Sequence, residues 1–245
     1  MSSSNPRVRL ARALIARRKD RWDERAFVVQ GPVLVAEALR AGINVRFVLR
    51  REDAVFDPAD VDVHEVDPRA FDDVNDTSTP QGVLAVCDMP ASVPIAAGDG
   101  WYIVAHGISD PGNLGTLIRS AEAAGATGVV VTHGTVDPFS PKAVRASAGA
   151  LFHVPLTFVR DLGDPALAGL HLIGTTSHVG PAVEDLWHSD VAGHVGIVFG
   201  NEAHGLAEDE PVSRWIRIPH SGRSESLNVA MAAAVVAMHV GRTQS

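Results

Sequence analysis

The sequence predicts an α/β protein in two parts: a small N-terminal α/β sandwich, and a larger C-terminal domain whose mostly parallel sheet carries helices on both faces. Short apolar runs alternate with helical patterns along the 245 residues. The apolar runs after residue 100 are continuous, which is typical of parallel strands buried on both faces. Between the two parts, residues 89–100 lack periodicity and are rich in proline, glycine and alanine, which indicates a linker.

The N-terminal part begins with an arginine-rich helix within residues 1–25, which we expect to form a basic arm. Pro32 suits the first turn of the next helix and Gly42 suits the position just after its end. The expected strands of this part are residues 26–30, 45–49, 61–66 and 83–87, and its expected helices are residues 32–41 and 69–74. These elements predict a first domain at residues 26–90.

The C-terminal part is expected to follow a linker at residues 91–100 and to fill residues 101–245. Its expected strands are residues 101–106, 128–132, 171–175, 195–200 and 215–218, and its expected helices are residues 114–124, 141–150 and 226–240. Because alternating strands and helices are typical of parallel sheets with right-handed crossovers, this alternation predicts a mostly parallel sheet with helices on both faces.

The net charge of −8 is distributed unevenly. Residues 1–25 hold eight basic residues against three acidic ones, whereas the other 220 residues hold 13 basic and 26 acidic ones. On charge alone, a solvated helix face is the commoner explanation of the basic segment. The alternative is an arm that binds nucleic acid, since lysine and arginine drive phosphate binding.

Several classes of protein are excluded by what the sequence lacks. The longest apolar stretches, such as residues 231–238, are far shorter than the roughly 20 residues of a membrane-spanning helix, and no secretory pattern is present, so we expect a cytoplasmic protein. The single cysteine, Cys87, excludes an internal disulfide and a cysteine-based zinc site, and no histidines have zinc-ligand spacing, so no metal is expected. The glycine fingerprints of dinucleotide-binding and P-loop proteins are also absent.

Residues 110–119, which read Asp-Pro-Gly-Asn-Leu-Gly-Thr-Leu-Ile-Arg, are the first of three segments that end a strand and open a loop. Open α/β sheets normally bind ligands at this edge. The turn leads into a helix that Asn113 can cap, and Arg119 projects from that helix. Alone the segment is weak evidence, since a strand, a glycine-rich turn and a helix with a surface arginine occur in many folds.

The other two segments have the same placement. Residues 197–206 run from an apolar strand into Gly200 and further polar residues, which could be simple turn chemistry. Residues 218–228 lead into a helix of small residues, and Ser226 and Asn228 stand where a helix N-terminus leaves backbone N–H groups free. An ordinary helix cap is the commoner use of serine and asparagine there.

Together, and in this order, the three segments resemble the motifs of the SpoU/TrmH family of the SPOUT superfamily. The residues that carry the resemblance are Asn113, Arg119, Gly200, Asn201, Glu202, Ile218, Pro219, Ser226, Leu227 and Asn228. The resemblance spans about residues 101–242. Residues 26–88 resemble, more loosely, the small substrate-binding domain that often precedes the catalytic domain in this family.

The resemblance implies an S-adenosylmethionine-dependent enzyme that methylates a ribose 2′-hydroxyl in structured RNA. Large-subunit ribosomal RNA is the first expectation and transfer RNA the alternative. The resemblance also implies a homodimer and a deep trefoil knot in the catalytic domain, although chain threading is nearly absent from proteins and physics alone would not predict it. The nucleotide, and whether its modification serves housekeeping or antibiotic resistance, cannot be inferred from these residues.

The resemblance also implies roles for individual residues. The implied catalytic set is Asn113, Arg119, Glu202, Ser226 and Asn228, and the implied cofactor-binding set is Thr175, Gly200, Asn201, Ile218 and Leu227. The family assigns removal of the hydroxyl proton to the position of Arg119, but a guanidinium stays protonated in proteins. Our hypothesis is that Arg119 binds a substrate phosphate through two hydrogen bonds and orients the 2′-hydroxyl.

Two other classes of function remain as alternatives. A non-catalytic RNA-binding protein could use the same scaffold, but it would have no reason to retain this set of polar residues. A flavodoxin-like oxidoreductase is the second, and the low aromatic content, 5% of residues, offers no evident pair of rings for a flavin.

Overall fold

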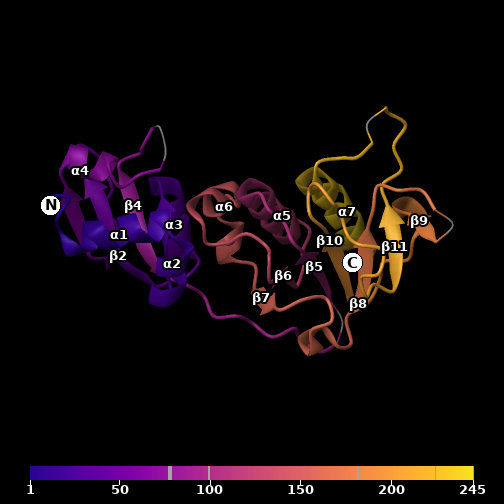
Figure 1. The fold of residues 1–245 in the computed structure, drawn as a ribbon. Helices are drawn as coiled ribbons and strands as arrows, with labels where there is room; N and C mark the ends of the chain where they lie inside the picture. Colours follow the sequence, from indigo (N-terminus) through magenta and orange to yellow (C-terminus); the bar gives the residue numbers. More distant parts are fainter. Residues whose placement is uncertain (77–78, 99, 181, 224, 245) are drawn as a thin grey trace. The chain divides into compact units, whose positions relative to one another are not determined.

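The computed structural model describes residues 1–76, 79–98, 100–180, 182–223 and 225–244. The chain forms two compact units (Figure 1). The first unit contains Met1–Pro90 and Asp137–Phe152, and the second contains Ala91–Val136 and His153–Ser245. The chain therefore passes between the units three times. No helix of the described residues is long and apolar enough to cross a lipid bilayer.

The first unit is built on a four-stranded sheet in the order β1-β4-β2-β3, in which β2 and β3 are parallel and the other pairs are antiparallel. The strands are β1 (Ala26–Gln30), β2 (Val45–Arg51), β3 (Val63–Val66) and β4 (Val83–Asp88). The helices are α1 (Pro6–Ala16), α2 (Arg18–Glu24), α3 (Pro32–Arg40), α4 (Pro68–Asp72) and α6 (Pro141–Ala146), followed by the short η1 (Ala150–Phe152).

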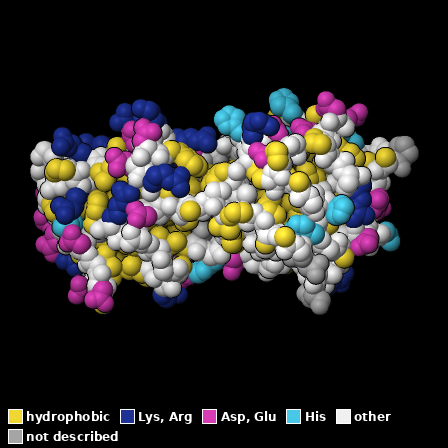
Figure 2. Space-filling view, turned by 90° about the horizontal axis from the view of Figure 1, so that it is seen from below, with side chains coloured by type: hydrophobic (Ala, Val, Ile, Leu, Met, Phe, Trp, Pro, Cys, Tyr) yellow, Lys and Arg dark blue, Asp and Glu magenta, His cyan; other side chains and the backbone are white. Residues whose placement is uncertain are grey.

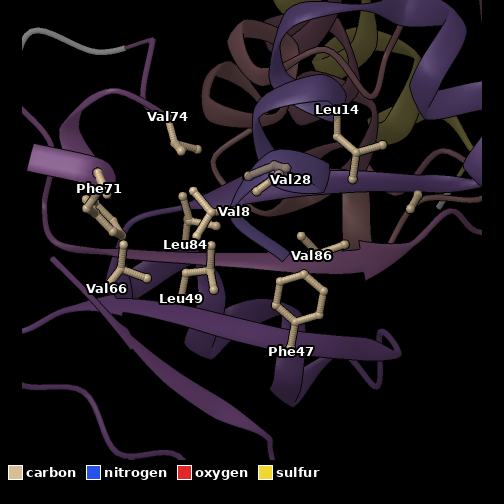
Figure 3. Packing of buried hydrophobic residues seen from close by; sticks show 13 residues of the cluster. Val8, Leu14, Val28, Phe47, Leu49, Val66, Phe71, Val74, Leu84 and Val86 are labelled. Atoms are coloured by element: carbon tan, nitrogen blue, oxygen red, sulfur yellow. The ribbon is translucent and has the colours of Figure 1, made fainter. Parts of the chain in front are cut away.

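Helix α1 belongs to the core of the first unit, whereas we expected a basic arm there. Asn5 caps the helix, because its side-chain oxygen accepts a hydrogen bond from the Arg7 amide at 2.9 Å. Val8, Ala11 and Leu14 recur along one face and are fully buried, in one cluster with residues of the sheet (Figure 3). Since burial of a valine or leucine side chain contributes about 1.5–3 kcal/mol, this stripe holds the helix on the unit.

Residues 137–152 also pack within the first unit, although we expected them in the C-terminal domain. Arg21 and Asp137 form a buried ion pair at 2.7 Å, and Arg21 donates a second hydrogen bond to the Leu14 carbonyl at 2.6 Å. The ring of Phe139 lies 5.2 Å from that of Phe27, between ring centroids. These contacts bind the segment to α2 and β1, and its helix α6 packs on β1.

The second unit is built on a seven-stranded sheet in the order β7-β6-β5-β10-β8-β11-β9, with every pair parallel. The strands are β5 (Trp101–Ala105), β6 (Gly128–Thr132), β7 (Leu156–Val159), β8 (His171–Thr175), β9 (Val183–Asp185), β10 (Val195–Phe199) and β11 (Arg214–Arg217). The parallel sheet is confirmed, but the two edge strands, β7 and β9, were not predicted. Strand β10 lies between β5 and β8, so the chain returns to the middle of the sheet; the knot remains a prediction.

Helices α5 (Pro111–Ala123) and α7 (Val229–Thr243) pack side by side (Figure 1). A Cβ atom added to Gly241 would overlap the Ala124 carbonyl oxygen, so only glycine lets the helices approach this closely. The N-terminal ends of the two helices are joined as well, since Asn228 donates a hydrogen bond to Asn113 at 3.1 Å. The helices are therefore parallel, and both begin at the carboxyl edge of the sheet.

The sheet has a second apolar cluster that contains no residue of α5 or α7. It includes Tyr102, Val104 and Val198 from the strands, and Leu167 from the short η2 (Pro165–Leu167). Ile95, Leu206 and Val212 pack against it. Extended chain therefore covers this part of the core. We expected the helix at residues 141–150 to cover it, but that helix is α6, which lies in the first unit. The remaining short helix of the second unit is η3 (Leu186–His188).

Candidate functional site

Three loops meet at the carboxyl edge of the second unit's sheet, and Glu202 joins two of them. This residue lies in the loop after β10, and its carboxylate accepts hydrogen bonds from the loop that follows β5. The donors are the Ser109 amide (2.9 Å), the Ser109 hydroxyl (2.6 Å), the Asp110 amide (3.0 Å) and the Asn113 side-chain nitrogen (2.9 Å). A single exposed carboxylate thus fixes the whole turn that leads into α5.

Glu202 is held in its ionised form at the N-terminal end of α5. The helix is capped by Asp110, whose side chain accepts from the Asn113 amide at 2.9 Å, and the Glu202 carboxylate lies against the amides just before it. Negative charge is stabilised at a helix N-terminus. Partial burial acts to raise the pKa of Glu202, but the hydrogen bonds from Asn113, Ser109 and Asp110 outweigh it and lower the pKa to about 2.

Asn113 extends this network to the third loop. Its side-chain nitrogen donates to Glu202, and its side-chain oxygen accepts from the side-chain nitrogen of Asn228 at 3.1 Å. The Asn228 oxygen in turn caps α7 by accepting from the amides of Ala230 (3.0 Å) and Met231 (3.3 Å). Because Asn113 uses both ends of its amide, an aspartate there could not make the same contacts.

Arg119 lies outside the network of Glu202, Asn113 and Asn228. It projects from α5 about 9 Å along the helix axis from Asn113, given a rise of about 1.5 Å per residue. The side chain is exposed, and it has no hydrogen bond or ion pair with any residue that the structure describes. Ser226 is exposed in the loop before α7 and likewise does not join the network within the described ranges.

The residues expected to bind a cofactor lie in the loops that follow β8, β10 and β11. Thr175 ends β8, and its hydroxyl donates to the Val198 carbonyl at 2.8 Å. Asn201 donates to the Gly107 carbonyl at 2.9 Å, which joins the loops after β10 and β5. Ile218 is half-buried and Leu227 is 40% exposed, so both present apolar surface beside these backbone turns.

Gly200 has a structural role, which is the turn chemistry that the sequence left open as an alternative. The family resemblance implied that Gly200 binds the cofactor. In the structure, a Cβ atom at this position would lie 2.5 Å from the carbonyl carbon and oxygen of Gly205, because the loop turns back tightly on itself. The turn alone therefore requires glycine at position 200.

A cavity of about 450 Å³ lies elsewhere on the second unit, between residues 162–172 and residues 211–213. These residues include the first part of β8 and the segment leading into β11, so the cavity lies toward the amino edge of the sheet. None of the candidate site residues lines it. Among the described residues, no group of three or more histidine, cysteine, aspartate or glutamate side chains could hold a metal ion.

His106 and Glu210 form a contact that the sequence analysis missed. His106 follows β5 directly, and its Nε2 atom lies 3.1 Å from a carboxylate oxygen of Glu210, in the segment between β10 and β11. Its Nδ1 atom lies 3.2 Å from the Thr132 hydroxyl at the end of β6. We examined histidines only for the spacing of metal ligands. The position of His106 at the carboxyl end of a buried strand was the signal available.

Comparisons with known protein families match almost the whole chain. The model of the SpoU rRNA Methylase family matches residues 100–238. The model of the MRM3-like substrate binding domain matches residues 5–85.

Individual proteins are similar over the same extent. The 23S rRNA (guanosine(2553)-2′-O)-methyltransferase RlmP of Bacillus subtilis (strain 168) is 32% identical over 235 residues, which cover 91% of each chain. Among solved structures, the SpoU methyltransferase AviRb from Streptomyces viridochromogenes in complex with the cofactor AdoMet has a TM-score of 0.86 at 27% identity and 97% coverage of both chains. The AdoMet-bound rRNA methyltransferase from Sinorhizobium meliloti has a TM-score of 0.85 at 29% identity, covering 99% of this chain and 96% of that one.

Proposed function

The chain belongs to the SpoU rRNA methylase family, and we propose that it methylates the ribose 2′-hydroxyl of a guanosine in 23S rRNA. It is an S-adenosylmethionine-dependent rRNA 2′-O-methyltransferase. The observation that carries the proposal is the hydrogen-bonded chain of Glu202, Asn113 and Asn228, which holds together the three loops that carry the family motifs. We assign residues 26–90 to RNA binding and residues 101–245 to catalysis, with residues 137–152 packed on the former. As an rRNA-modifying enzyme it would act in the cytoplasm.

The loops after β8, β10 and β11 fit an adenosyl cofactor. Ile218 and Leu227 provide apolar surface for an adenine ring, and the turns at Thr175, Gly200 and Asn201 provide backbone polar groups. When bound, S-adenosylmethionine supplies an electrophilic methyl group whose transfer leaves a neutral thioether, so no protein group has to act as an acid. The task of the residues is therefore to position the two reactants.

We assign to Arg119 the positioning of the RNA. Its guanidinium stays protonated, so it cannot accept the proton of the hydroxyl. It can instead bind a phosphate through two parallel hydrogen bonds and so orient the neighbouring 2′-hydroxyl, whose proton would pass to a phosphate oxygen. The exposure of Arg119 and its lack of a partner among the described residues support this role. Glu202, Asn113, Ser226 and Asn228 would keep the loops in shape.

A homodimer fits the exposed face of α7. Met231, Val235 and Met238 lie at i, i+4 and i+7 on this helix and are 65%, 37% and 53% exposed. Such an apolar stripe on a helix is typical of an interface. We propose that two copies pair through it, so that Arg119 serves a site completed by the second copy. Light scattering should give twice the mass of the chain for the wild type and one chain mass for Met238→Lys.

Transfer of a radiolabelled methyl group to unmodified 23S rRNA and, separately, to transfer RNA tests the proposal. We expect label in 23S rRNA only, at a position that resists alkaline cleavage. Arg119→Ala should abolish it, whereas Arg160→Ala should not, since Arg160 is an exposed arginine of the same unit that is paired with Asp161. Label in transfer RNA instead would mean that transfer RNA, and not 23S rRNA, is the substrate. Failure of the protein to bind S-adenosylmethionine would favour the alternative of a non-catalytic RNA-binding protein.

A further inference from the structure

We propose that Arg18 and Arg25, held beside the ring of Trp22, form a binding site for backbone phosphates of the RNA substrate. We call these three residues the arginine pair site. The inference rests on the proposed function, because it assumes that RNA is the substrate. It goes further by assigning phosphate contacts to two particular side chains of the first unit.

The geometry brings both guanidiniums to one aromatic ring. The Cζ atom of Arg18 lies 5.8 Å from the centroid of Trp22, and the Cζ atom of Arg25 lies 5.6 Å from it. Both distances are within the range of about 6 Å in which a cation is attracted to an aromatic ring. The ring itself is held by edge contact with the buried Phe139, at 6.2 Å between centroids. A fixed ring therefore restricts two flexible arginines to its surroundings before any ligand binds.

The positive charge of this pair is not neutralised by the neighbouring acids. Each acidic residue of α2 already pairs with another cation: Asp20 with Arg17 at 2.8 Å, Asp23 with Lys19 at 3.5 Å, and Glu24 with Arg46 at 3.9 Å. Arg18 and Arg25 are exposed, and neither guanidinium forms an ion pair or hydrogen bond with another residue of the described ranges. Two guanidiniums with free N–H groups therefore face solvent, as phosphate binding requires.

The backbone at Arg25 gives an independent observation. Arg25 ends α2 in the left-handed conformation, with φ 52° and ψ 41°, where glycine is the usual residue. An arginine adopts this conformation at a cost that glycine avoids. Strained positions of this kind concentrate at functional sites. The chain thus keeps the charged side chain at a position where a helix end alone would favour glycine.

The site lies in the unit that holds most of the lysine and arginine residues of the chain. On the face shown in Figure 2, lysine and arginine side chains gather mainly on the N-terminal part, at the left, with acidic side chains among them. Arg9 and Arg12 on α1 add two more cations without an ion-pair partner among the residues described. Arg9 and Arg12 therefore add further positive charge, close in the sequence to Arg18 and Arg25, that could attract an RNA strand.

The test compares two double variants that remove the same charge. Binding of the full chain to unmodified 23S rRNA transcript is measured over a range of salt concentrations. Arg18→Ala/Arg25→Ala should weaken binding on the order of tenfold and reduce the salt slope by about 1.5, since each lost phosphate contact lowers it by about 0.7–0.9. Arg17→Ala/Lys19→Ala, which removes two paired cations beside them, should change binding less than threefold. Equal effects of the two variants would mean that only long-range charge matters, and would overturn the proposal.

Arg25→Gly separates binding from folding. Glycine relieves the left-handed strain, so the variant should melt at the same temperature as the wild type or higher while binding the transcript more weakly. Unchanged RNA binding in this variant would remove Arg25 from the site. The outcome is distinct from failure of the proposed function, which would appear as a wild-type protein that transfers no methyl group to 23S rRNA.

Discussion

Two sets of exposed charged side chains differ in their partners. One is the carboxylate of Glu202 in the second unit, and the other is the pair of guanidiniums of Arg18 and Arg25 in the first unit. The Glu202 carboxylate accepts four hydrogen bonds, whereas neither guanidinium has a hydrogen bond or ion pair within the described part of the chain. Exposure alone therefore does not separate charged groups that shape the protein from those available to a ligand. The partners separate them, and by this criterion Arg119 belongs with the two arginines.

The largest effect is expected at Arg119. Arg119→Lys keeps the positive charge but loses the planar pair of donors, so kcat/KM for methyl transfer to 23S rRNA should fall about 100-fold, which is a typical cost of misplaced reactants. Binding of S-adenosylmethionine, measured by calorimetry, should not change. Near-normal turnover in this variant would contradict the two-bond phosphate contact and leave only a role for charge.

The next effect concerns the group that joins the three loops. Asn113→Asp replaces the donor to Glu202 with a second negative charge, and a hydrogen bond to a charged group contributes about 1.5–3 kcal/mol. We expect an increase of at least tenfold in the dissociation constant for S-adenosylmethionine. Asp161→Asn is the control, because it exchanges aspartate and asparagine in the same unit and should leave binding of S-adenosylmethionine unchanged. If Asn113→Asp bound the cofactor normally, the loops would not depend on this network.

The pH dependence of stability should reveal the partners of Glu202 directly. Its pKa is lowered to about 2 from a usual value near 4.5, so the folded state favours the ionised form. The stability that this gives is fully present above pH 4.5 or so and is lost as the pH falls toward 2. Urea unfolding of the wild type and Glu202→Gln should therefore show a difference at pH 7 that shrinks across this window. A difference that stays constant would mean that the carboxylate is not held by these donors.

The smallest effect is expected for His106 and Glu210. Their contact joins the end of β5 to the segment between β10 and β11, but both side chains are partly exposed, so we expect a coupling of about 0.5–1 kcal/mol. A double-mutant cycle with His106→Asn and Glu210→Gln, read as cofactor affinity, measures it. The pair Arg160 and Asp161 should show no coupling to cofactor affinity. Zero coupling between His106 and Glu210 would mean that their contact does not contribute to cofactor affinity.

The sequence predicted the central strands of the second unit because their apolar runs are long enough to stand out. Strand β9 has three residues, which is too short for a pattern, whereas β7 was missed although it has four residues, as β11 does. The helix at α6 was also predicted, but not the sheet that it covers. Its segment is placed by Arg21, which is far away in the sequence and bonds Asp137. Periodicity indicates that an element exists, whereas long-range pairing decides where it packs.

The candidate site shows the same division. The motif residues Asn113, Glu202 and Asn228 could be selected from the sequence, and the structure joins them in one network. For Gly200 the sequence offered turn chemistry only as an alternative, because the approach of Gly205 that requires glycine exists only in the folded turn. His106 and Glu210 were missed since neither belongs to a motif and only the fold brings them together.

The three passages of the chain between the units have a consequence for dissection of the protein. A protease that cut within the expected linker, residues 91–100, would not separate two independent domains, because residues 137–152 remain part of the first unit. The fragment 1–90 would lack both Asp137 and Phe139, so Arg21 would lose its carboxylate and Phe27 would lose a ring that packs against it. The fragment that begins after residue 90 would carry residues 137–152 without the sheet on which they pack. We therefore expect the two units to be stable only together and to evolve together. A family member that lost its N-terminal unit would also need changes in residues 137–152.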